Sequence, residues 1–497
     1  MIGNIEQLAF DLVPVTPSWE LRFGAESAGW AGLAIWIGGH NLCSHVEPGS
    51  TEVKQHLFVP LGPLADWLVR SFPALAFEER ARDFPTGSFP HRDARQWGKV
   101  RPPAGYDSDQ WFAAREAWWS RHFVRAGAEG ARLPDLALIR DDEHLVCSWD
   151  TPRFVQPGGP AMMWREGRVH VRWCEAAPTL DGFLSTVSDY FRCEGAADIY
   201  AWTTNPTPLW EYTGSLEEAV EFYCGRDISN VQALLGGADA KTTLELLHLA
   251  PTARDPAESP HCQILRQLSN DLSADVGHLL RDIGDRAFLP NAERARRWKK
   301  ARVVAFDAAR AGDSPEAAGQ LAANELRGQI GIDGQPIADL SNVLGEFGID
   351  AAETDVGGGR DRMMVAATLG GSPIAVTLNT PRTATAWGVR FEQARALGHV
   401  LLDPLRGEAV GAASGPFASG TRHRRSGAFA AELLLPESAL ARASDGRLDG
   451  IATADAFGVL MAEYGAGART AAFQLWNRGW LSSPAVRDEL IDRYASS

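Results

Sequence analysis

The tryptophan residues of this 497-residue chain are unevenly distributed, since 13 of the 17 lie in residues 1–210. A single hydrophobic core stops growing at about 250 to 300 residues, so a chain of this length is expected to divide into domains. The change in composition predicts that residues 1–210 form one domain and that the more alanine-rich remainder folds separately.

The charge and cysteine content exclude several classes of protein. The chain has 48 Lys and Arg against 63 Asp and Glu, and its formal charge of −15 does not favour nonspecific binding to nucleic acid or anionic lipid. Its six cysteines are widely spaced and form no CxxC pair, which fits neither a disulfide framework nor a zinc ribbon. We therefore expect a reduced, cytoplasmic protein.

Targeting and membrane segments are not predicted. The first twenty residues lack the basic start and the apolar run of a signal peptide. The sequence also contains no apolar run of the length, about 18 residues, that is needed to span a membrane. We expect no membrane partner.

Strand and helix patterns alternate in residues 1–210. Val169, Val171 and Trp173 alternate with polar residues, which predicts a strand with one buried face. We expect a mixed α+β domain whose tryptophans fill the core rather than stack on a ligand. The predicted elements are two hairpins, 135–140 with 144–149 and 161–164 with 168–173, and two helices, 61–72 and 179–191.

The rest of the chain is helical in pattern, which makes the whole an α+β multidomain protein. Residues 211–310 are expected to be a helical connecting region, in which 251–260 has the composition of a linker or exposed loop. Residues 311–497 are expected to be a mainly helical domain with a small β-sheet, because strands 363–369 and 373–379 flank a Gly-Gly turn. The helices predicted there are 314–329, 337–347, one from about 385, one ending at Pro436, and two from Ala454 and Ala468.

Two of these helices carry the most specific motif. Residues 389–403 read VRFEQARALGHVLLD, and residues 424–436 read RRSGAFAAELLLP. They resemble the active-site helix and the third-ligand helix of the ImmA/IrrE family, whose HExxH motif holds a catalytic zinc. The resemblance extends over about residues 314–497 and implies a zincin-like metallopeptidase fold. It does not cover the first 310 residues.

The residues that perform the family's chemistry are replaced in this chain. Arg395 stands in place of the first zinc-binding histidine, Ala396 in place of the catalytic glutamate, and Arg425 in place of the acidic third ligand. His399 is the one motif residue that remains. A catalytic zinc needs about three protein ligands, and its water needs a carboxylate as general base. We therefore predict no catalytic residue, no metal and no cofactor.

The predicted binding site of this degenerate cleft consists of Arg395, His399 and Arg425. Arg395 and His399 lie one helical turn apart on the same face. Arg425 would join them if the fold matches the family. Three hydrogen-bond donors at one place would suit an anionic ligand such as phosphate or carboxylate.

The competing interpretation is a set of structural ion pairs. Glu392, Asp403 and Glu432 lie close enough in sequence to neutralise the two arginines. For His399 alone, a core histidine is the ordinary explanation. A structure separates the two interpretations, because they place different atoms around the guanidinium groups.

Weaker candidates have structural explanations that we favour. His40, Cys43 and His45 match no zinc motif and are expected beside a strand. The basic helix 293–302 is expected to be a solvated face, although contact with nucleic acid is an alternative that the acidic chain disfavours. The glycine cluster 356–360 is expected to be a loop.

The leading functional hypothesis is a non-catalytic regulatory or binding protein, a pseudoenzyme that acts with a protein partner. Members of the resembled family act beside repressors, toxin–antitoxin pairs, stress responses and mobile elements, so the resemblance implies a setting such as antiviral defence. The first alternative is an active metallopeptidase that recruits His399, Asp403 and His423 and cleaves a protein partner. A third hypothesis places an enzyme in residues 1–210, because catalytic groups can meet from distant positions.

Overall fold

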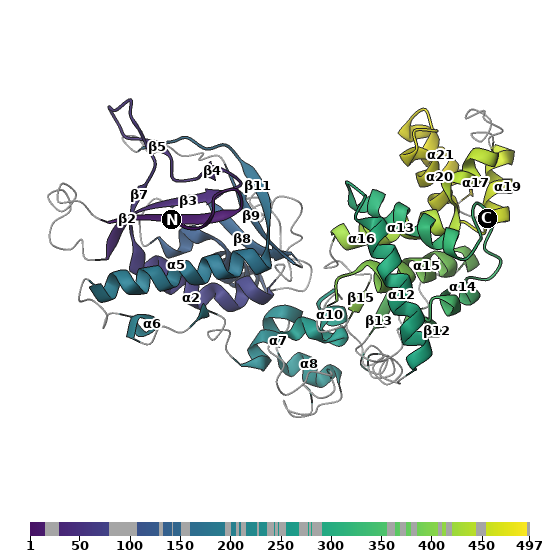
Figure 1. Cartoon of the computed structure of the whole chain (residues 1–497), viewed down its shortest axis with the longest axis horizontal. Helices are drawn as coiled ribbons and strands as arrows, with labels where there is room; N and C mark the ends of the chain where they lie inside the picture. The colour runs from purple at the N-terminus through teal and green to yellow at the C-terminus, as the bar shows by residue number, and fades with distance from the viewer. Residues whose placement is uncertain are drawn as a thin grey trace. The chain divides into compact units, whose positions relative to one another are not determined.

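The computed structural model contains two compact units, Met1–Arg226 and Asp227–Ser497, which we describe separately (Figure 1). In the part of the chain that the structure describes, no helix is long and apolar enough to cross a membrane. The backbone alone is described for 234, 257, 351–354, 363–367, 374–378 and 454–455. The described residues are 1–14, 29–78, 107–128, 133–141, 143–150, 160–193, 200–204, 208–209, 215–225, 228–235, 243, 247, 255–267, 277, 280, 291–354, 363–367, 374–378, 385–405, 410–413, 420–443 and 454–494.

The first unit is built around antiparallel sheets. The largest has the strand order β1-β2-β3-β4. Strand β4 pairs with the end of β3, and β7 pairs with the beginning of β3. Its central strand is apolar along most of its length and is therefore buried. The strands are β1 (Ile2–Asn4), β2 (Leu8–Pro14), β3 (Trp30–Ile37), β4 (His40–Asn41) and β7 (Leu57–Pro60).

The second sheet of this unit confirms one predicted hairpin and corrects the other. Strands β8 (Leu136–Asp141) and β9 (His144–Trp149) pair antiparallel as expected. Strand β11 (Gly167–Arg172) pairs with the free side of β9, and Val171 faces the core. The segment 161–164 does not pair with β11, because β10 (Ala161–Met162) instead joins β5 (His45–Val46) in a small sheet with β6 (Val53–Lys54). Proximity in sequence suggested the wrong partner for this short strand.

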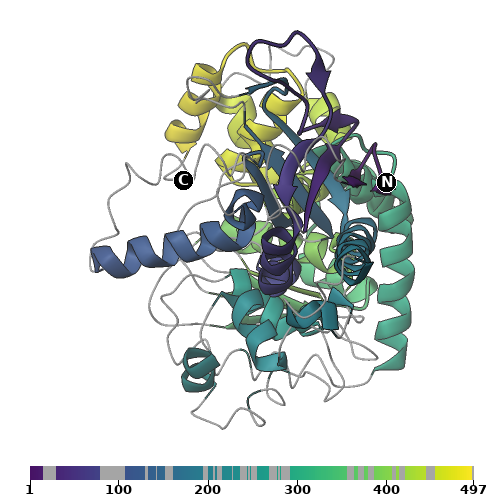
Figure 2. The same cartoon turned by 90° about the vertical axis from the view of Figure 1, so that its left-hand side faces the viewer.

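Helices α2 (Leu61–Phe77) and α5 (Trp173–Cys193) lie side by side along the strands, and Figure 2 shows them nearly end-on. Both are longer than predicted, since each contains a proline that does not end it. Their apolar faces join the sheets in one core that includes Trp67, Trp149 and Trp202. The described tryptophans of this core are thus packing residues, as predicted. The remaining helical segments are α4 (Ser108–His122), η2 (Val124–Gly127), α6 (Ala201–Thr204) and α7 (Leu216–Cys224).

The second unit combines one four-stranded sheet with many helices. The strand order is β12-β14-β13-β15, with β12 parallel to β14 and the other pairs antiparallel. The predicted pairing of 363–369 with 373–379 is confirmed, while the turn between them lies outside the described residues. The strands are β12 (Asp350–Thr354), β13 (Met363–Ala367), β14 (Ile374–Leu378) and β15 (Val410–Ala413).

Helices α12 to α15 of this unit each begin after a residue whose side chain caps the helix. Ser314 caps α13 and is followed by proline at the first helical position, and Thr385 caps α15 through its side-chain oxygen. The chain as a whole is a mixed α/β protein, with small antiparallel sheets in its first half and mainly helices in its second. The helices are α8 (Ile228–Leu234), η4 (Pro256–Glu258), α10 (Pro260–Gln267), α12 (Ala292–Ala309), α13 (Pro315–Gln329), α14 (Leu340–Glu346), α15 (Ala386–Leu402), α16 (Gly420–Leu434), α17 (Glu437–Ala443), α19 (Ala454–Tyr464), α20 (Ala468–Asn477) and α21 (Pro484–Tyr494).

The middle of the chain is divided between the two units instead of forming a connecting region. Helix α7 belongs to the first unit, whereas α10 and α12 belong to the second. The physical reason is that α10 and α12 hydrogen-bond to β15 and to the last turn of α15, respectively. Of the expected linker 251–260, residues 251–254 lie outside the described residues, and Ser259 and Pro260 are buried rather than exposed.

Candidate functional site

Helices α15 and α16 form the pair on which the predicted site residues lie. Leu397 of α15 and Phe429 and Leu433 of α16 are fully buried in one apolar cluster. A Cβ atom at Gly398 would lie 3.0 Å from the ring of Phe429, so the glycine allows the helices to approach closely. The apolar pattern that predicted both helices is therefore the pattern that packs them together.

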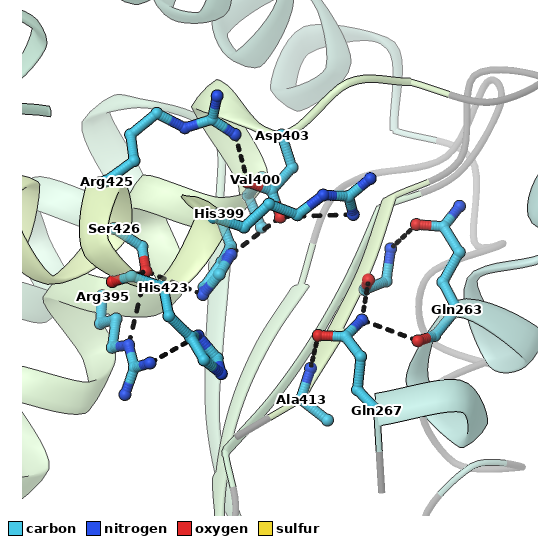
Figure 3. Close-up of polar contacts among 12 residues, drawn as sticks. Gln263, Gln267, Arg395, His399, Val400, Asp403, Ala413, His423, Arg425 and Ser426 are labelled. Carbon is cyan, nitrogen blue, oxygen red and sulfur yellow. Dashed lines mark hydrogen bonds and ion pairs between the residues drawn. The ribbon is translucent and has the colours of Figure 1, made fainter. Parts of the chain in front are cut away.

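Asp403, which follows α15, is the centre of a buried polar cluster (Figure 3). Its Oδ2 accepts a hydrogen bond from His399 Nδ1 at 2.8 Å, and its Oδ1 accepts one from Arg425 Nη2 at 2.8 Å. Arg422 Nη1 lies 3.8 Å from Oδ2. The Asp403 and His399 side chains have no exposed surface. We call Asp403, His399, Arg425, Arg422 and Ser426 the Asp403 cluster.

Ser426 of α16 extends the cluster to Arg395 (Figure 3). Since the carboxylate occupies Nδ1–H of His399, its Nε2 is the acceptor for the Ser426 hydroxyl, at 2.9 Å. Arg395 Nε lies 3.4 Å from the same hydroxyl oxygen, and Arg395 Nη2 donates to His423 Nδ1 at 2.5 Å. Glu392 Oε1 is 3.6 Å from Arg395 Nη1.

The pKa shifts fit a neutral histidine beside an ionised aspartate. Burial lowers the pKa of His399 below its ordinary value, although the Asp403 carboxylate opposes the shift. Burial by itself would raise the pKa of Asp403, but His399, Arg422 and Arg425 together hold it well below the usual range. The cluster therefore carries one buried negative charge that cationic partners compensate.

Side chains of helix α12 support the cluster by hydrogen bonding to the last turn of α15. Trp298 Nε1 donates to the carbonyl of Val400, and Arg302 donates to the carbonyls of Val400, Leu401 and Asp403. Burial lowers the pKa of Arg302 to about 10, and the nearby Asp403 charge limits that shift. These side chains satisfy carbonyl groups that have no partner within the helix. The basic segment 293–302 therefore contributes a tryptophan and an arginine to the core.

The structure brings the three predicted residues into one hydrogen-bonded network. They do not converge on one common binding partner. Arg425 and His399 share Asp403, while Arg395 and His399 share Ser426. The ion-pair interpretation fits Arg425 with Asp403 and Arg395 with Glu392. It was wrong for Glu432, which binds Gln474 of α20 and Arg478, the residue that follows α20.

Sequence reasoning missed Ser426 and Arg302. Ser426 lies one residue after Arg425 in the motif, but no spacing rule connects it with His399 on another helix. Arg302 lies about a hundred residues before its acceptors. Their roles follow from the packing of α12, α15 and α16 and leave no signal in a local pattern.

The chain Ser426–His399–Asp403 has the order of groups that activates a serine nucleophile in hydrolases. The histidine would accept the hydroxyl proton, and the carboxylate would orient the imidazole. However, Ser426 is 1 % exposed, and its hydroxyl also lies against Arg395 and its own helix carbonyl at His423. Among the residues that the structure describes, Ser426, His399 and Asp403 thus join α15 to α16, and the hydroxyl has almost no exposed surface at which a substrate could bind.

The donor atoms do not fit the zinc site that the resemblance implies. Both ring nitrogens of His399 and both oxygens of Asp403 already have partners, and His423 Nδ1 accepts from Arg395. In the part of the chain that the structure describes, no group of three or more His, Cys, Asp or Glu side chains is placed to hold a metal ion. Arg395 and Arg425 add positive charge beside the position where a cation would bind.

The weaker candidates lie where a structural role explains them. Cys43 is buried, which raises the pKa of its thiol to about 12, and a protonated thiol is a poor metal ligand. His45 Nδ1 bonds to the carbonyl of Cys43. His40 is an exposed residue of β4. The glycine cluster 356–360 lies outside the described residues.

Comparison with known proteins gave no match to a family model, to a curated protein or to a solved structure.

Proposed function

We propose that the chain is a non-catalytic regulatory or binding protein whose second unit is a degenerate ImmA/IrrE-like metallopeptidase domain. It would act in the cytoplasm with a protein partner, in stress, toxin–antitoxin or phage-defence regulation. The observation that carries the proposal is the Asp403 cluster. Polar side chains around His399 bind one another, and by the resemblance Arg395 and Arg425 stand where the family has two zinc ligands.

The packing of α15 against α16 supports the peptidase ancestry. The motif residues Leu397, Gly398 and Phe429 form the contact between the two helices. A chain that keeps this contact while losing the ligands retains the scaffold and not the chemistry. The alternative peptidase with His399, Asp403 and His423 as ligands would have to break four hydrogen bonds to free these side chains.

Restoring the motif tests this ancestry directly. The triple variant Arg395→His, Ala396→Glu and Arg425→Glu recreates two histidines and an acidic ligand on the same two helices. We expect the parent protein to carry no stoichiometric zinc and the triple variant to approach one zinc per chain by elemental analysis. The matched control omits Arg425→Glu and should bind zinc more weakly. A parent protein that itself carries one zinc, lost in His399→Ala, would contradict the proposal.

A second experiment decides whether the site still accepts an anion. Arg425 has its charge compensated by Asp403, so we expect the network rather than an anion pocket. In the double variant Arg395→Gln and Arg425→Gln, thermal stability should fall clearly, because Asp403 loses a partner. Inorganic phosphate should stabilise neither the parent nor the variant. Phosphate-dependent stabilisation of the parent that disappears in the variant would restore the pocket interpretation.

A further inference from the structure

The second unit contains a cavity that the Asp403 cluster does not use. It has a volume of about 410 Å³ and lies between the end of α13, the loop that follows this helix and the start of α17. Pockets that bind small molecules usually measure about 300 to 1,000 Å³, so a small organic ligand can enter. The polar residues that line the cavity are Asn324, Arg327, Asp333, Glu437 and Ser438, and Gly334 contributes its backbone.

Arg327 forms the buried side of this cavity. It is 1 % exposed and donates to three backbone carbonyls, while its Nε–H has no hydrogen-bond partner among the described residues. Burial lowers the pKa of this guanidinium, and the charges of Glu432 and Asp333 oppose the shift. Neutral carbonyl groups do not cancel the charge, so Arg327 makes this side of the cavity attractive to an anionic group.

Gly334 leaves a gap between two hydrogen-bond donors at the cavity. Its φ of +63° lies in the left-handed region, and its carbonyl accepts from the Tyr464 hydroxyl at 2.8 Å. A Cβ atom at Gly334 would lie 2.9 Å from both Arg442 Nη2 and Ser438 Oγ. Arg442 has five N–H groups, of which the bond to Tyr464 at 3.0 Å uses one. The guanidinium and the hydroxyl can therefore donate together to a ligand oxygen beside Gly334.

Asp333 gives the same cavity a negative group. It is exposed, and its Oδ1 would lie 3.7 Å from a Cβ atom at Gly328, which places the carboxylate beside the last turn of α13. In the described part of the chain, Asp333 forms no ion pair with Arg442 or with another cation. Asn324 lies one helical turn before Arg327 and adds an amide oxygen. A carboxylate and a guanidinium that border one cavity without pairing leave space for a ligand that bridges them.

The charges around the cavity are balanced. Arg478 Nη1 pairs with Glu437 Oε2 at 2.5 Å, and Arg478 Nη2 pairs with Glu432 Oε2 at 3.0 Å. The charged groups at the cavity are thus three arginines and three carboxylates, namely Arg327, Arg442, Arg478, Asp333, Glu432 and Glu437. A ligand with a net charge would disturb this balance, whereas a ligand with one positive and one negative group preserves it.

We propose that this cavity binds a small zwitterion of the amino-acid class. The carboxylate of the ligand accepts from the Arg442 guanidinium and the Ser438 hydroxyl. Its ammonium group donates to the Asp333 carboxylate and to the Asn324 amide oxygen. This inference goes beyond the proposed function, because it gives the second unit a small-molecule ligand in addition to a protein partner.

The test is isothermal titration of the full-length chain with the proteinogenic L-amino acids, one at a time. The control ligands are the N-acetyl derivative and the amide of each amino acid that binds, because each derivative lacks one of the two charges. We expect at least one amino acid to bind with a Kd of about 1 mM or below. Both of its derivatives should bind at least about tenfold more weakly, since each loses its charge-assisted hydrogen bonds at one end.

Variants locate the bound ligand. Asp333→Asn and Arg442→Gln should each weaken binding at least about tenfold. Gly334→Ala should abolish it, because the methyl group fills the gap between Arg442 and Ser438. The matched control is Gly331→Ala, which should bind like the parent chain, since Gly331 has a similar φ of +68° and a Cβ atom there meets nothing within 4 Å. If Gly334→Ala does not fold, the exposed Asp333→Asn still decides the question.

Three results would overturn the inference. Binding of no amino acid by the folded parent chain would show that the cavity is not such a site. Equal binding of an amino acid and one of its derivatives would show that a single charge is recognised. Binding that Asp333→Asn and Arg442→Gln leave unchanged would place the ligand elsewhere. These measurements leave Arg395 and Arg425 untouched, so a failure here and a failure of the zinc experiment are distinguishable.

Discussion

Each unit contains a buried carboxylate that closes the end of a helix, and the two differ in their surroundings. Glu78 follows α2, and Asp403 follows α15. Glu78 accepts hydrogen bonds from Arg121 at 3.0 and 2.9 Å and lies 3.1 Å from His122 Nε2. The same three kinds of side chain thus meet in a part of the molecule where the sequence suggested no site.

The Glu78 group shows what a histidine, an arginine and a carboxylate do when they only connect helices. Arg121 and His122 end α4, so the contact fixes α4 against α2. The Asp403 cluster does the same for α15 and α16, but its Asp403 and His399 side chains are completely buried, and it continues through Ser426 to Arg395. The kinds of side chain present therefore do not distinguish the Asp403 cluster from the Glu78 group, whereas their burial and their further hydrogen bonds do.

The largest expected effect separates the two carboxylates by burial. Asp403→Asn should lower the free energy of unfolding by about 3 to 5 kcal/mol, because it leaves buried guanidinium groups without a countercharge. Glu78→Gln should cost about 1 to 3 kcal/mol, since Arg121 is partly exposed and can be solvated. Urea unfolding of the full-length chain, with hydrogen exchange to identify the affected unit, measures both. Equal losses of unfolding free energy in the two variants would contradict the expected effect of burial.

A second prediction asks whether packing or polar contacts hold α15 to α16. Leu397→Ala should lower the free energy of unfolding by about 2 to 5 kcal/mol, because Leu397 is fully buried. The exposed Leu321 on α13 is the matched control, and Leu321→Ala should change stability by less than about 1 kcal/mol. A melting curve that Leu397→Ala leaves unchanged would mean that the Asp403 cluster alone joins the helices.

The smallest expected effect is a difference between the pH ranges in which His399 and Glu78 make the stability depend on pH. The pKa of His399 is lowered from 6.5 in the fold, so below that pH the unfolded chain takes up a proton that the folded chain refuses, and stability falls. The pKa of Glu78 is lowered from 4.5, despite the opposing effect of burial, because of His122 and Arg121, so its contribution is lost only at lower pH.

Variants isolate these two contributions from other titrating groups. His399→Gln should flatten the dependence of unfolding free energy on pH between about 6.5 and 5, whereas Glu78→Gln should change the slope only below about 4.5. The measurement is a series of urea unfolding curves across that range. An unchanged slope in His399→Gln above pH 5 would show that His399 does not titrate with unfolding.

The sequence predicted the positions of the helices better than it predicted which side chains contact one another across them. Apolar periodicity located α15 and α16, and the cap at Thr385 marked where α15 begins. It could not show that Ser426 bonds to His399, because that contact depends on how two helices are rotated against each other. Nor could it show that Glu432 faces Arg478, since helical phase and the position of α20 decide that pairing.

Non-local pairing explains the other differences. Strand β10 was expected beside β11 because the two are neighbours in sequence, yet it adds to β5, more than a hundred residues earlier. Helix α10 follows a segment with the composition of an exposed linker, and its burial results from the edge of β15. In both cases the deciding partner is a strand edge that only the folded sheet provides.

The contacts of α12 with α15 also decide which fragment of this protein can fold autonomously. A fragment that begins at residue 311, where composition suggests a domain start, lacks Trp298 and Arg302 and leaves the last carbonyls of α15 to water. The helix that carries His399 would then fray at the end nearest Asp403. The smallest cooperative folding unit that contains α15 therefore starts before α12, and α12 is as much a part of it as the motif that it supports.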